Sequence, residues 1–279
     1  GKSLAYGREL LAKAGIETAF LDARLLMQQA LHCSVEQLFL NDTQPINAHA
    51  NGLFFSMIER RLNREPIAKI IGRKSFWKHE FFTTKDTLDP RPETEIIIEV
   101  ALNHFSPPPI GGRLGGGLGG LGALHAPSLT LPLLGRESVF HVLDLGTGTG
   151  CIVLSILGEF PNATGVGADI SKAALKVANK NAEALQLQDR VEFIHSDWAA
   201  NIKGGYDLIV SNPPYIAEGE ILPREVAHYD PASALFAGSE GLDAYRALLP
   251  RAAELLKKDG ILILEIGLGQ EEIGRASCR

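Results

Sequence analysis

The chain has 279 residues, of which 45% are hydrophobic and 22% charged, as in an ordinary globular protein with a sizeable core. No apolar run approaches the ~20 residues that span a bilayer, and the N-terminus lacks the apolar stretch of a secretory signal. The net charge of -6 argues against nucleic-acid binding by bulk electrostatics, and the scattered Cys33, Cys151 and Cys278 indicate a reducing, cytoplasmic compartment without a disulfide framework or metal site.

The N-terminal quarter has apolar residues at helical spacing. Leu10, Leu11 and Ala14 fit a 3.6-residue period, and similar sets recur up to about residue 71. Gly15 and the later Asn-Asp and Gln-Pro steps are typical of breaks between helices. We therefore predict a small helical bundle in residues 1–74.

A basic stretch runs from Phe54 to Lys78. It holds seven cations and only two carboxylates. A solvated surface is the ordinary explanation for such a stretch, and a partner-docking face is the less common one. The sequence does not distinguish them.

Residues 75–98 have a different character and are predicted to link two domains. Phe76, Trp77 and the Thr83-Thr84 pair favour short extended strands, which predicts a hairpin. A stiff, proline-containing loop follows, and an apolar helix is expected to start near Ile96.

Residues 109–136 are rich in glycine and follow a run of three prolines. Such a segment has too few packing side chains to offset its ordering entropy, so we predict an inserted flexible loop. A phosphate-cradling loop is the alternative, but no strand precedes the segment and no Lys-Ser/Thr pair closes it.

From residue 139 onward strands and helices alternate, which is typical of a parallel sheet covered by helices. We expect strands at Val139–Leu145, Thr164–Ala168, Val191–His195, Asp207–Val210 and Ile261–Glu265, and helices at Gly150–Glu159, Ser171–Leu185 and Leu242–Lys258. The Asp259-Gly260 step is expected to end the last helix. Residues 99–279 are therefore predicted to form an α/β domain.

The first strand of this domain leads into a glycine-rich turn, Gly146-Thr147-Gly148-Thr149-Gly150. Such a turn lets a ligand approach the backbone, and Asp169, at the end of the next strand, could accept hydrogen bonds from both hydroxyls of a ribose. Asp144, before the turn, is expected to hold the loop or a ligand amine. The Gly-x-Gly-x-Gly form resembles the S-adenosylmethionine site of class I methyltransferases, with a Rossmann-like sheet, more than a dinucleotide site.

The third strand of the domain ends in Ser196-Asp197-Trp198. In methyltransferases of this kind the corresponding edge borders the adenine of the cofactor. Asp197 could therefore accept a hydrogen bond from the exocyclic amine, and Trp198 could pack against the adenine ring. A strand-end cap and a core indole are equally good explanations for Trp198.

Asn212-Pro213-Pro214-Tyr215 follows the fourth strand. An amide nitrogen is a poor nucleophile because its lone pair is delocalised into the carbonyl. A useful site must accept hydrogen bonds from both of its N–H groups. The side-chain oxygen of Asn212 and the backbone carbonyl of Pro213 are two such acceptors, and the prolines stiffen the backbone that carries them. Tyr215 could lie against the planar group. A structural proline turn is the alternative, but a cofactor loop two strands earlier disfavours it.

The Asn-Pro-Pro-Tyr motif also occurs in adenine-N6 and guanine-N2 methyltransferases, so other segments must indicate the substrate. These segments closely resemble the release factor glutamine N5-methyltransferase family. They are Gly72–Trp77, Asp89–Glu95, Tyr229-Asp230-Pro231 with Ala234-Leu235, Gly241–Arg246 and Leu264–Gln270. The resemblance implies that the helical bundle of residues 1–74 is a substrate-binding domain, which helps hold the protein that is methylated.

This resemblance implies transfer of a methyl group from S-adenosyl-L-methionine, giving S-adenosyl-L-homocysteine, to the glutamine of the Gly-Gly-Gln motif in peptide-chain release factors. It implies cofactor contacts at Gly146 to Gly150, Asp169 and Trp198, and amide contacts at Asn212 to Tyr215, with Asn212 bordering both ligands. Arg91 and Thr94 are expected to shape the cofactor or substrate pocket, and a purely structural role in their own loop is the alternative for both. Two other substrates stay open as alternatives: a glutamine of a ribosomal protein and an amino group of a nucleic acid. A third alternative is a protein that keeps the fold but has no enzymatic activity.

Two features depart from the family pattern. One is the insert at 109–136, which is expected to be tolerated as a surface excursion. The other is the segment after about residue 270, which resembles a foreign tail where the family has two further strands. We therefore expect an exposed sheet edge and low stability.

Overall fold

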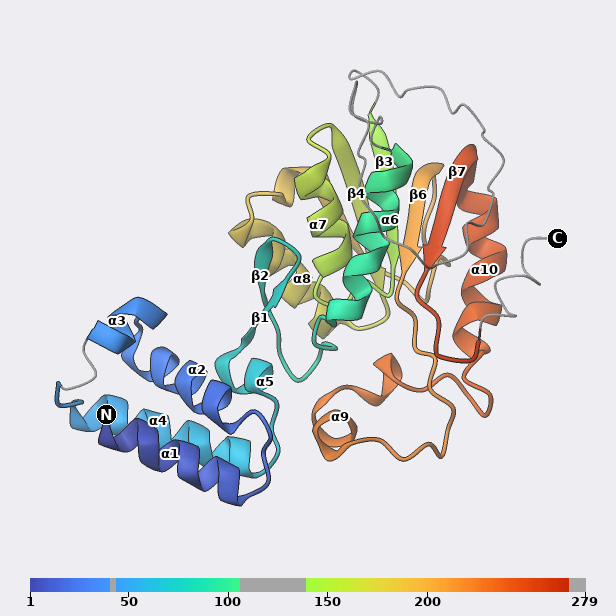
Figure 1. Cartoon of the computed structure of the whole chain (residues 1–279). Coiled ribbons are helices and arrows are strands. Elements are labelled where there is room, and N and C mark those ends of the chain that lie inside the picture. Colours follow the sequence, from blue (N-terminus) through green and yellow to red (C-terminus); the bar gives the residue numbers. More distant parts are fainter. Residues whose placement is uncertain (41–43, 106–138, 271–279) are drawn as a thin grey trace, which may run out of the picture.

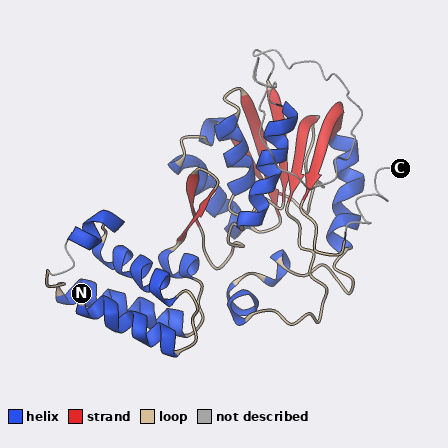
Figure 2. Ribbon diagram, viewed as in Figure 1, coloured by secondary structure: helices blue, strands red, loops and turns tan. Residues whose placement is uncertain are grey.

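The computed structural model describes residues 1–40, 44–105 and 139–270, which form a helical N-terminal unit and a larger α/β unit (Figure 1). A two-stranded hairpin lies between the two units (Figure 2). The predicted insert and the segment after residue 270 lie outside the described residues. The division into domains at residues 74 and 98 stays a prediction.

The N-terminal unit consists of helices, as the periodicity predicts. They are α1 (Lys2–Lys13), α2 (Ala19–Leu31), α3 (Val35–Leu40), α4 (Ala48–Leu62) and α5 (Ile67–Ile71). The side-chain oxygen of Asn47 caps α4 by accepting the amide of Ala50 at 2.8 Å. The apolar faces of α1, α2 and α4 share one core, and the buried Arg61 donates to Asp22 at 2.7 Å inside it.

The hairpin pairs β1 (Arg73–Phe76) with β2 (His79–Phe82) in antiparallel register. The buried side chain of Asn181 fixes this hairpin to the α/β unit, because it bonds both backbone groups of Phe82. The same amide donates to the carbonyl of Thr149, at the start of α7. One side chain therefore connects the linker to the glycine-rich turn.

The α/β unit contains a parallel sheet of five strands in the order β5-β4-β3-β6-β7. They are β3 (Phe140–Leu145), β4 (Ala163–Asp169), β5 (Val191–His195), β6 (Tyr206–Ser211) and β7 (Leu256–Leu264). Alternate residues of β3 face opposite cores: Val142 packs with α6 and α7, and Leu143 packs with α10. The α/β prediction is confirmed.

The helices and short turns of this unit are η1 (Pro92–Thr94), α6 (Glu95–Phe105), α7 (Cys151–Glu159), α8 (Lys172–Ala184), η2 (Gln188–Arg190), α9 (Arg224–Tyr229), η3 (Ala232–Ala234) and α10 (Asp243–Leu255). The helices predicted at 150–159, 171–185 and near Ile96 are confirmed within two residues. The segment 224–234 carries a helix and a turn that the sequence pattern did not predict.

The predicted end of the last helix is wrong. Helix α10 ends at Leu255, and β7 begins at once, with Leu256 paired to Tyr206. The Asp259-Gly260 step forms an irregularity within the strand, where Lys257 donates to Asp207 at 2.7 Å. Pairing with β6 therefore overrides the local helical preference of these residues.

Six of the seven cations in the basic stretch 54–78 have an acidic partner. The pairs are Arg60–Glu65, Arg61–Asp22, Arg64–Glu225, Lys69 with Asp89 and Asp230, Arg73–Glu80 and Lys78–Glu159. Internal ion pairing accounts for most of this charge. The stretch is therefore largely a set of structural contacts.

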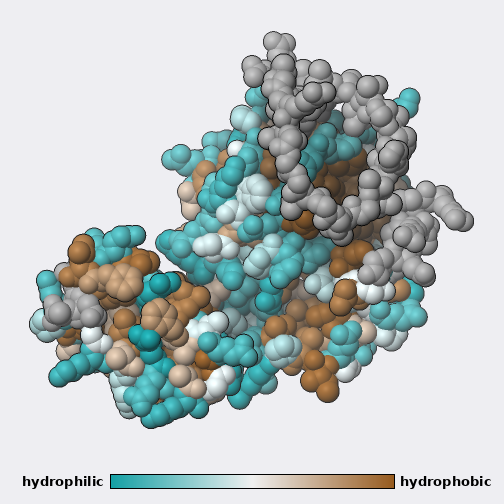
Figure 3. All heavy atoms as spheres, viewed as in Figure 1, coloured by the Kyte–Doolittle hydropathy of each residue, from teal (hydrophilic) through white to brown (hydrophobic). Residues whose placement is uncertain are grey.

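Three further features concern the surface and the composition of the described residues. Apolar residues gather over the N-terminal helices on the face seen in Figure 3. Across the described ranges, no helix is both long and apolar enough to cross a membrane. The same residues bring together no cluster of His, Cys, Asp and Glu side chains that could hold a metal ion.

Candidate functional site

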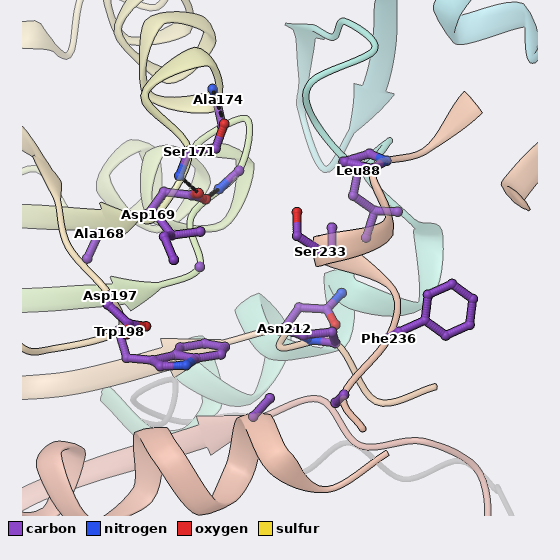
Figure 4. Close-up of a pocket in the computed structure, with 18 of the residues that line it drawn as sticks. Leu88, Ala168, Asp169, Ser171, Ala174, Asp197, Trp198, Asn212, Ser233 and Phe236 are labelled. Atoms are coloured by element: carbon purple, nitrogen blue, oxygen red, sulfur yellow. Dashed lines mark hydrogen bonds between the residues drawn. The ribbon is translucent and has the colours of Figure 1, made fainter. Parts of the chain in front are cut away.

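Polar side chains from all five strands meet at the carboxyl edge of the sheet. A cavity of about 550 Å³ lies there, where β3 and β6 are neighbours. The chain after β3 continues to β4 on one side of this point, and the chain after β6 continues to β7 on the other side. Seven of the site residues predicted from the sequence line this cavity: Gly146, Gly148, Asp169, Asp197, Trp198, Asn212 and Pro214. Figure 4 shows Asn212 in this hollow, between Trp198 and Phe236.

The glycine-rich turn begins where β3 ends and leads into α7. Gly146 and Gly148 have φ angles of 74° and 56°, in the left-handed region that glycine adopts without a steric penalty. Asp144 lies beneath the turn, fully buried, and accepts a hydrogen bond from the Thr147 hydroxyl at 2.7 Å. Burial raises the pKa of the Asp144 carboxyl to about 7. Its contacts show that Asp144 holds the loop.

Three members of the predicted glycine loop lie outside the cavity lining. Thr147 and Thr149 are buried, and the Thr147 hydroxyl points to Asp144. A Cβ atom at Gly150 would stand 3.1 Å from Leu154 and 3.2 Å from Phe193, so this glycine permits close packing of the turn on its neighbours. These residues shape the turn, and only Gly146 and Gly148 reach the cavity.

Asp169 lies at the end of β4 and lines the cavity. Its two oxygens accept the backbone amides of Gly148 and Ser171, each at 2.8 Å. Burial raises the pKa of this carboxyl, and the two amides lower it. A carboxylate has about four lone-pair sites, so about two stay available to hydroxyl donors in the cavity.

Asp197 and Trp198 follow β5 and also line the cavity. Trp198 has a φ angle of 46°, which is uncommon for a bulky residue and costs backbone strain. Its half-buried ring faces the turn: a Cβ atom at Gly146 would lie 3.6 Å from it. The indole therefore forms a wall of the cavity, and a purely internal core position is ruled out.

Asn212 follows β6, whose end is tied to β3 by a hydrogen bond from Ser211 to the carbonyl of Leu145 at 2.6 Å. The Asn212 side-chain nitrogen donates to the Thr94 hydroxyl at 2.9 Å, and Thr94 donates to Glu265 at 2.6 Å. Burial raises the pKa of the Glu265 carboxyl, and hydrogen bonds from Thr94 and Tyr215 lower it.

A second cavity, of about 260 Å³, adjoins the first, and Leu88, Asn212, Pro214 and Ala234 line both. Pro213 and Tyr215 line only this second cavity. The Tyr215 hydroxyl lies 3.4 Å from Glu265, and burial raises its pKa. The four residues of the Asn-Pro-Pro-Tyr motif are thus brought together at the junction of two hollows.

Sequence reasoning missed several residues of this site. Leu88, Ser233 and Phe236 line the first cavity, and Glu265 lines the second. Arg91 lines the second cavity and donates to Asp230 at 2.8 Å. Leu88, Ser233 and Phe236 lie outside the segments that resemble the family, so no sequence signal pointed to them. Glu265 lies within such a segment, and Arg91 was already expected to shape the pocket or its loop.

Two protein families and several known proteins are similar to this chain. Residues 2–72 match the PrmC N-terminal domain, and residues 125–228 match the Methyltransferase small domain. A release factor glutamine methyltransferase of Rhodospirillum rubrum is 39% identical, over 97% of this chain and 74% of that protein. One of Cereibacter sphaeroides is 41% identical, over 95% of this chain and 84% of that protein.

A bifunctional methyltransferase of Rickettsia felis is 38% identical, and the chain spans about half of its length: 51% of that protein and 96% of this chain are covered. Among solved structures, a SAM-dependent methyltransferase of Agrobacterium tumefaciens matches with a TM-score of 0.47 and 18% identity. That match covers 74% of this chain and 58% of the other.

Proposed function

This chain belongs to the release factor glutamine methyltransferase family, and we propose that it methylates the side-chain amide nitrogen, N5, of the Gly-Gly-Gln glutamine in peptide-chain release factors. It is a methyltransferase that uses S-adenosylmethionine. The methyl acceptor, the roles of the site residues and a cytoplasmic place of action are parts of the proposal.

The first cavity fits the cofactor. Its volume of about 550 Å³ suits a ligand of that size, and its lining is mainly apolar, with a few polar groups. Gly146 and Gly148 leave the backbone of the turn accessible, Asp169 keeps lone pairs for the ribose hydroxyls, and Trp198 and Asp197 would border the adenine. When bound, the cofactor supplies an electrophilic methyl group on a positively charged sulfur.

The observation that carries the proposal is that Asn212 and Pro214 line both cavities. A group held at this junction from the second cavity would lie next to a cofactor in the first. The second cavity is small, with the Tyr215 ring and the apolar side chains of Ile216 and Val226 in its lining, which suits an extended side chain with a flat end.

In the proposed mechanism, the Asn212 side-chain oxygen and the Pro213 carbonyl accept the two N–H bonds of the substrate amide. These bonds fix the plane of the amide and direct the face of the nitrogen toward the first cavity. Tyr215 packs beside the plane. Orientation in a site shielded from water then supplies most of the acceleration, and no general base is required before methyl transfer.

The helical unit is proposed to help hold the release factor. Several of its large apolar side chains are exposed: Phe20, Phe39, Leu40 and Leu53. Exposed apolar side chains of this size are typical of protein-binding surfaces when they form a patch. The paired charges of the basic stretch make direct nucleic-acid binding by this unit an unfavoured alternative.

The test is methylation of a purified release factor with cofactor labelled in its methyl group, followed by mass spectrometry of the Gly-Gly-Gln peptide. One methyl group is expected on that glutamine, and none on a release factor whose glutamine is changed to alanine. Label on a ribosomal protein or on nucleic acid, with none on the release factor, would contradict the proposed substrate.

Asn212→Ala tests the proposed mechanism. Loss of an acceptor made for the reacting group is expected to lower kcat about 100-fold. Asn179→Ala is the matched control, because Asn179 lies exposed on α8 and outside both cavity linings. Equal activity of the two variants would refute the role of Asn212.

A further inference from the structure

Behind Asn212 lies a chain of hydrogen bonds that joins three distant parts of the sequence. Thr94 comes from η1, Asn212 follows β6 and Glu265 follows β7. The Asn212 nitrogen donates to the Thr94 oxygen at 2.9 Å, and the Thr94 hydroxyl donates to the Glu265 carboxylate at 2.6 Å. Thr94 is 2% exposed, so water has little access to this chain.

The chain has a fixed direction when Glu265 is ionised. A carboxylate only accepts hydrogen bonds, and a threonine hydroxyl has one hydrogen to donate. Once that hydrogen points to Glu265, Thr94 can offer Asn212 only a lone pair. The amide nitrogen of Asn212 must then face Thr94, and the Asn212 oxygen must face the other way.

This direction matters because an asparagine amide can turn over at little steric cost, exchanging its oxygen and its NH₂. Turned over, Asn212 would present hydrogen-bond donors to the NH₂ group of the substrate, and the acceptor would be lost. We propose that Thr94 and Glu265 are positioning residues that hold the Asn212 oxygen toward the substrate amide, an inference that rests on the proposed function.

Neighbouring contacts keep Glu265 in place as the end of this chain. Its backbone amide donates to the carbonyl of Ser211 at 3.0 Å, which sets it beside Asn212 through the pairing of β6 and β7. Its backbone carbonyl accepts from the Tyr245 hydroxyl at 3.1 Å. Its second carboxylate oxygen lies 3.4 Å from the Tyr215 hydroxyl, so both oxygens face donors.

The experiment compares Thr94→Val with Thr94→Ser. Valine has nearly the same shape and no hydroxyl, and serine keeps the hydroxyl. At pH 8 with saturating cofactor, Thr94→Val is expected to lower kcat about tenfold, the equivalent of one lost net hydrogen bond, and to leave the Kd for S-adenosylmethionine within about twofold. Thr94→Ser is expected to restore kcat to within about threefold of the unmodified protein.

Thr83→Val is the matched control for a purely structural effect. Thr83 is also buried, and its hydroxyl also donates to a carboxylate, that of Asp89, at 2.6 Å. It lines neither cavity. We expect Thr83→Val and Thr94→Val to lower Tm by similar amounts, because each removes one buried hydrogen bond. The kcat of Thr83→Val is expected to stay within about twofold of that of the unmodified protein.

Glu265→Gln provides a second test, since a glutamine can donate as well as accept and no longer fixes the direction of the chain. Its kcat is expected to fall about tenfold at an unchanged Kd for S-adenosylmethionine.

Full kcat in Thr94→Val or Glu265→Gln, with Asn212→Ala inactive, would overturn the positioning role and leave the proposed function standing. Full activity of Asn212→Ala would overturn both.

Discussion

The two sides of the site are built in different ways. On the cofactor side, defined as Gly146, Gly148, Asp169 and Trp198, the residues follow three adjacent strands within about fifty positions of the sequence. On the acceptor side, defined as Thr94, Asn212, Tyr215 and Glu265, hydrogen bonds join residues 118 and 171 positions apart. The first side depends on local turns, and the second depends on how distant segments pack.

This difference has a consequence for how each side fails. A defect on the cofactor side should appear as weaker binding of S-adenosylmethionine, because these residues line the cavity proposed to hold that ligand. A defect on the acceptor side should appear in kcat or in stability, since the same groups hold distant segments together. Four changes break or sharpen this contrast.

The largest expected effect is on stability, from Lys69→Met. Lys69 is buried on α5 and pairs with Asp89 at 2.9 Å and Asp230 at 3.2 Å, residues beside the segments that close the cavity. Its loss leaves the buried Asp89 without its cation and Asp230 with Arg91 alone, which is expected to lower the free energy of unfolding by about 3–5 kcal/mol. Denaturant unfolding measures this value.

Lys78→Met is the control for this prediction. Lys78 also pairs with a carboxylate, that of Glu159, but its side chain is 65% exposed. A loss below about 1 kcal/mol is expected for such an exposed pair. Equal losses in the two variants would show that Lys69 does not hold the acceptor side together.

Asp169→Ala is expected to have the next largest effect, on cofactor binding. It removes a carboxylate that receives two backbone amides and faces the cavity. The affinity for S-adenosylmethionine should fall about 100-fold, as expected for the loss of charge-assisted hydrogen bonds. Calorimetry measures it, with Asp189→Ala, an exposed carboxylate on η2, as the control. Unchanged affinity would remove Asp169 from the cofactor site.

Gly241→Ala should disturb the acceptor side. Gly241 has a φ angle of 70°, and a Cβ atom there would lie 2.3 Å from the carbonyl oxygen of Tyr215. A loss of about 2 kcal/mol in stability is expected from strain and overpacking, together with a lower kcat. Binding of S-adenosylmethionine should change little, which calorimetry would check.

Gly72→Ala separates strain from overpacking. Gly72 has a φ angle of 78°, and nothing lies within 4 Å of its Cβ position. Only the conformational cost of about 1 kcal/mol is expected, with kcat unchanged. If both glycine variants lose kcat alike, close packing against Tyr215 is not the cause.

The smallest expected effect concerns pH and Asp144→Asn. The folded-state pKa of Asp144 is raised from 3.8 to about 7, so the folded protein binds this proton more tightly than the unfolded chain does. The resulting stabilisation is fully present below the unfolded-state value of 3.8 and is lost progressively as the pH rises from there through the folded-state value of about 7. Between pH 6 and pH 8 the unmodified protein should lose roughly 1 kcal/mol more than the variant.

Unfolding curves at both pH values measure this difference. Other titrating groups are shared by the two proteins, so their contributions cancel in the comparison. A variant with the same pH dependence as the unmodified protein would mean that Asp144 is already ionised in the folded protein throughout that range.

Much of the fold was predictable from sequence because its signals act over short distances. Helical periodicity predicted α1, α2 and α4, and strand–helix alternation predicted the parallel sheet. The start of β7 was wrongly predicted, because Leu256 joins the sheet through pairing with Tyr206, fifty residues away. The expected insert and the expected tail fall largely on residues outside the described ranges.

The candidate site was predictable to the same extent. The sequence by itself determined the glycine turn, the acidic residue after the next strand and the Asn-Pro-Pro-Tyr motif, since each is a local pattern with a local conformational need. Tertiary structure decided which of these residues reach a cavity: Gly146 and Gly148 do, and Thr147 and Thr149 do not.

The tertiary structure also decided the direction of the Asn212 amide. That direction depends on Thr94 and Glu265, which meet Asn212 only because η1 packs against the edge of the sheet and β7 pairs with β6. A hydrogen-bond chain of this kind leaves no periodic pattern in a sequence, because its members need only the right distance and the right number of hydrogens, and both are set by packing.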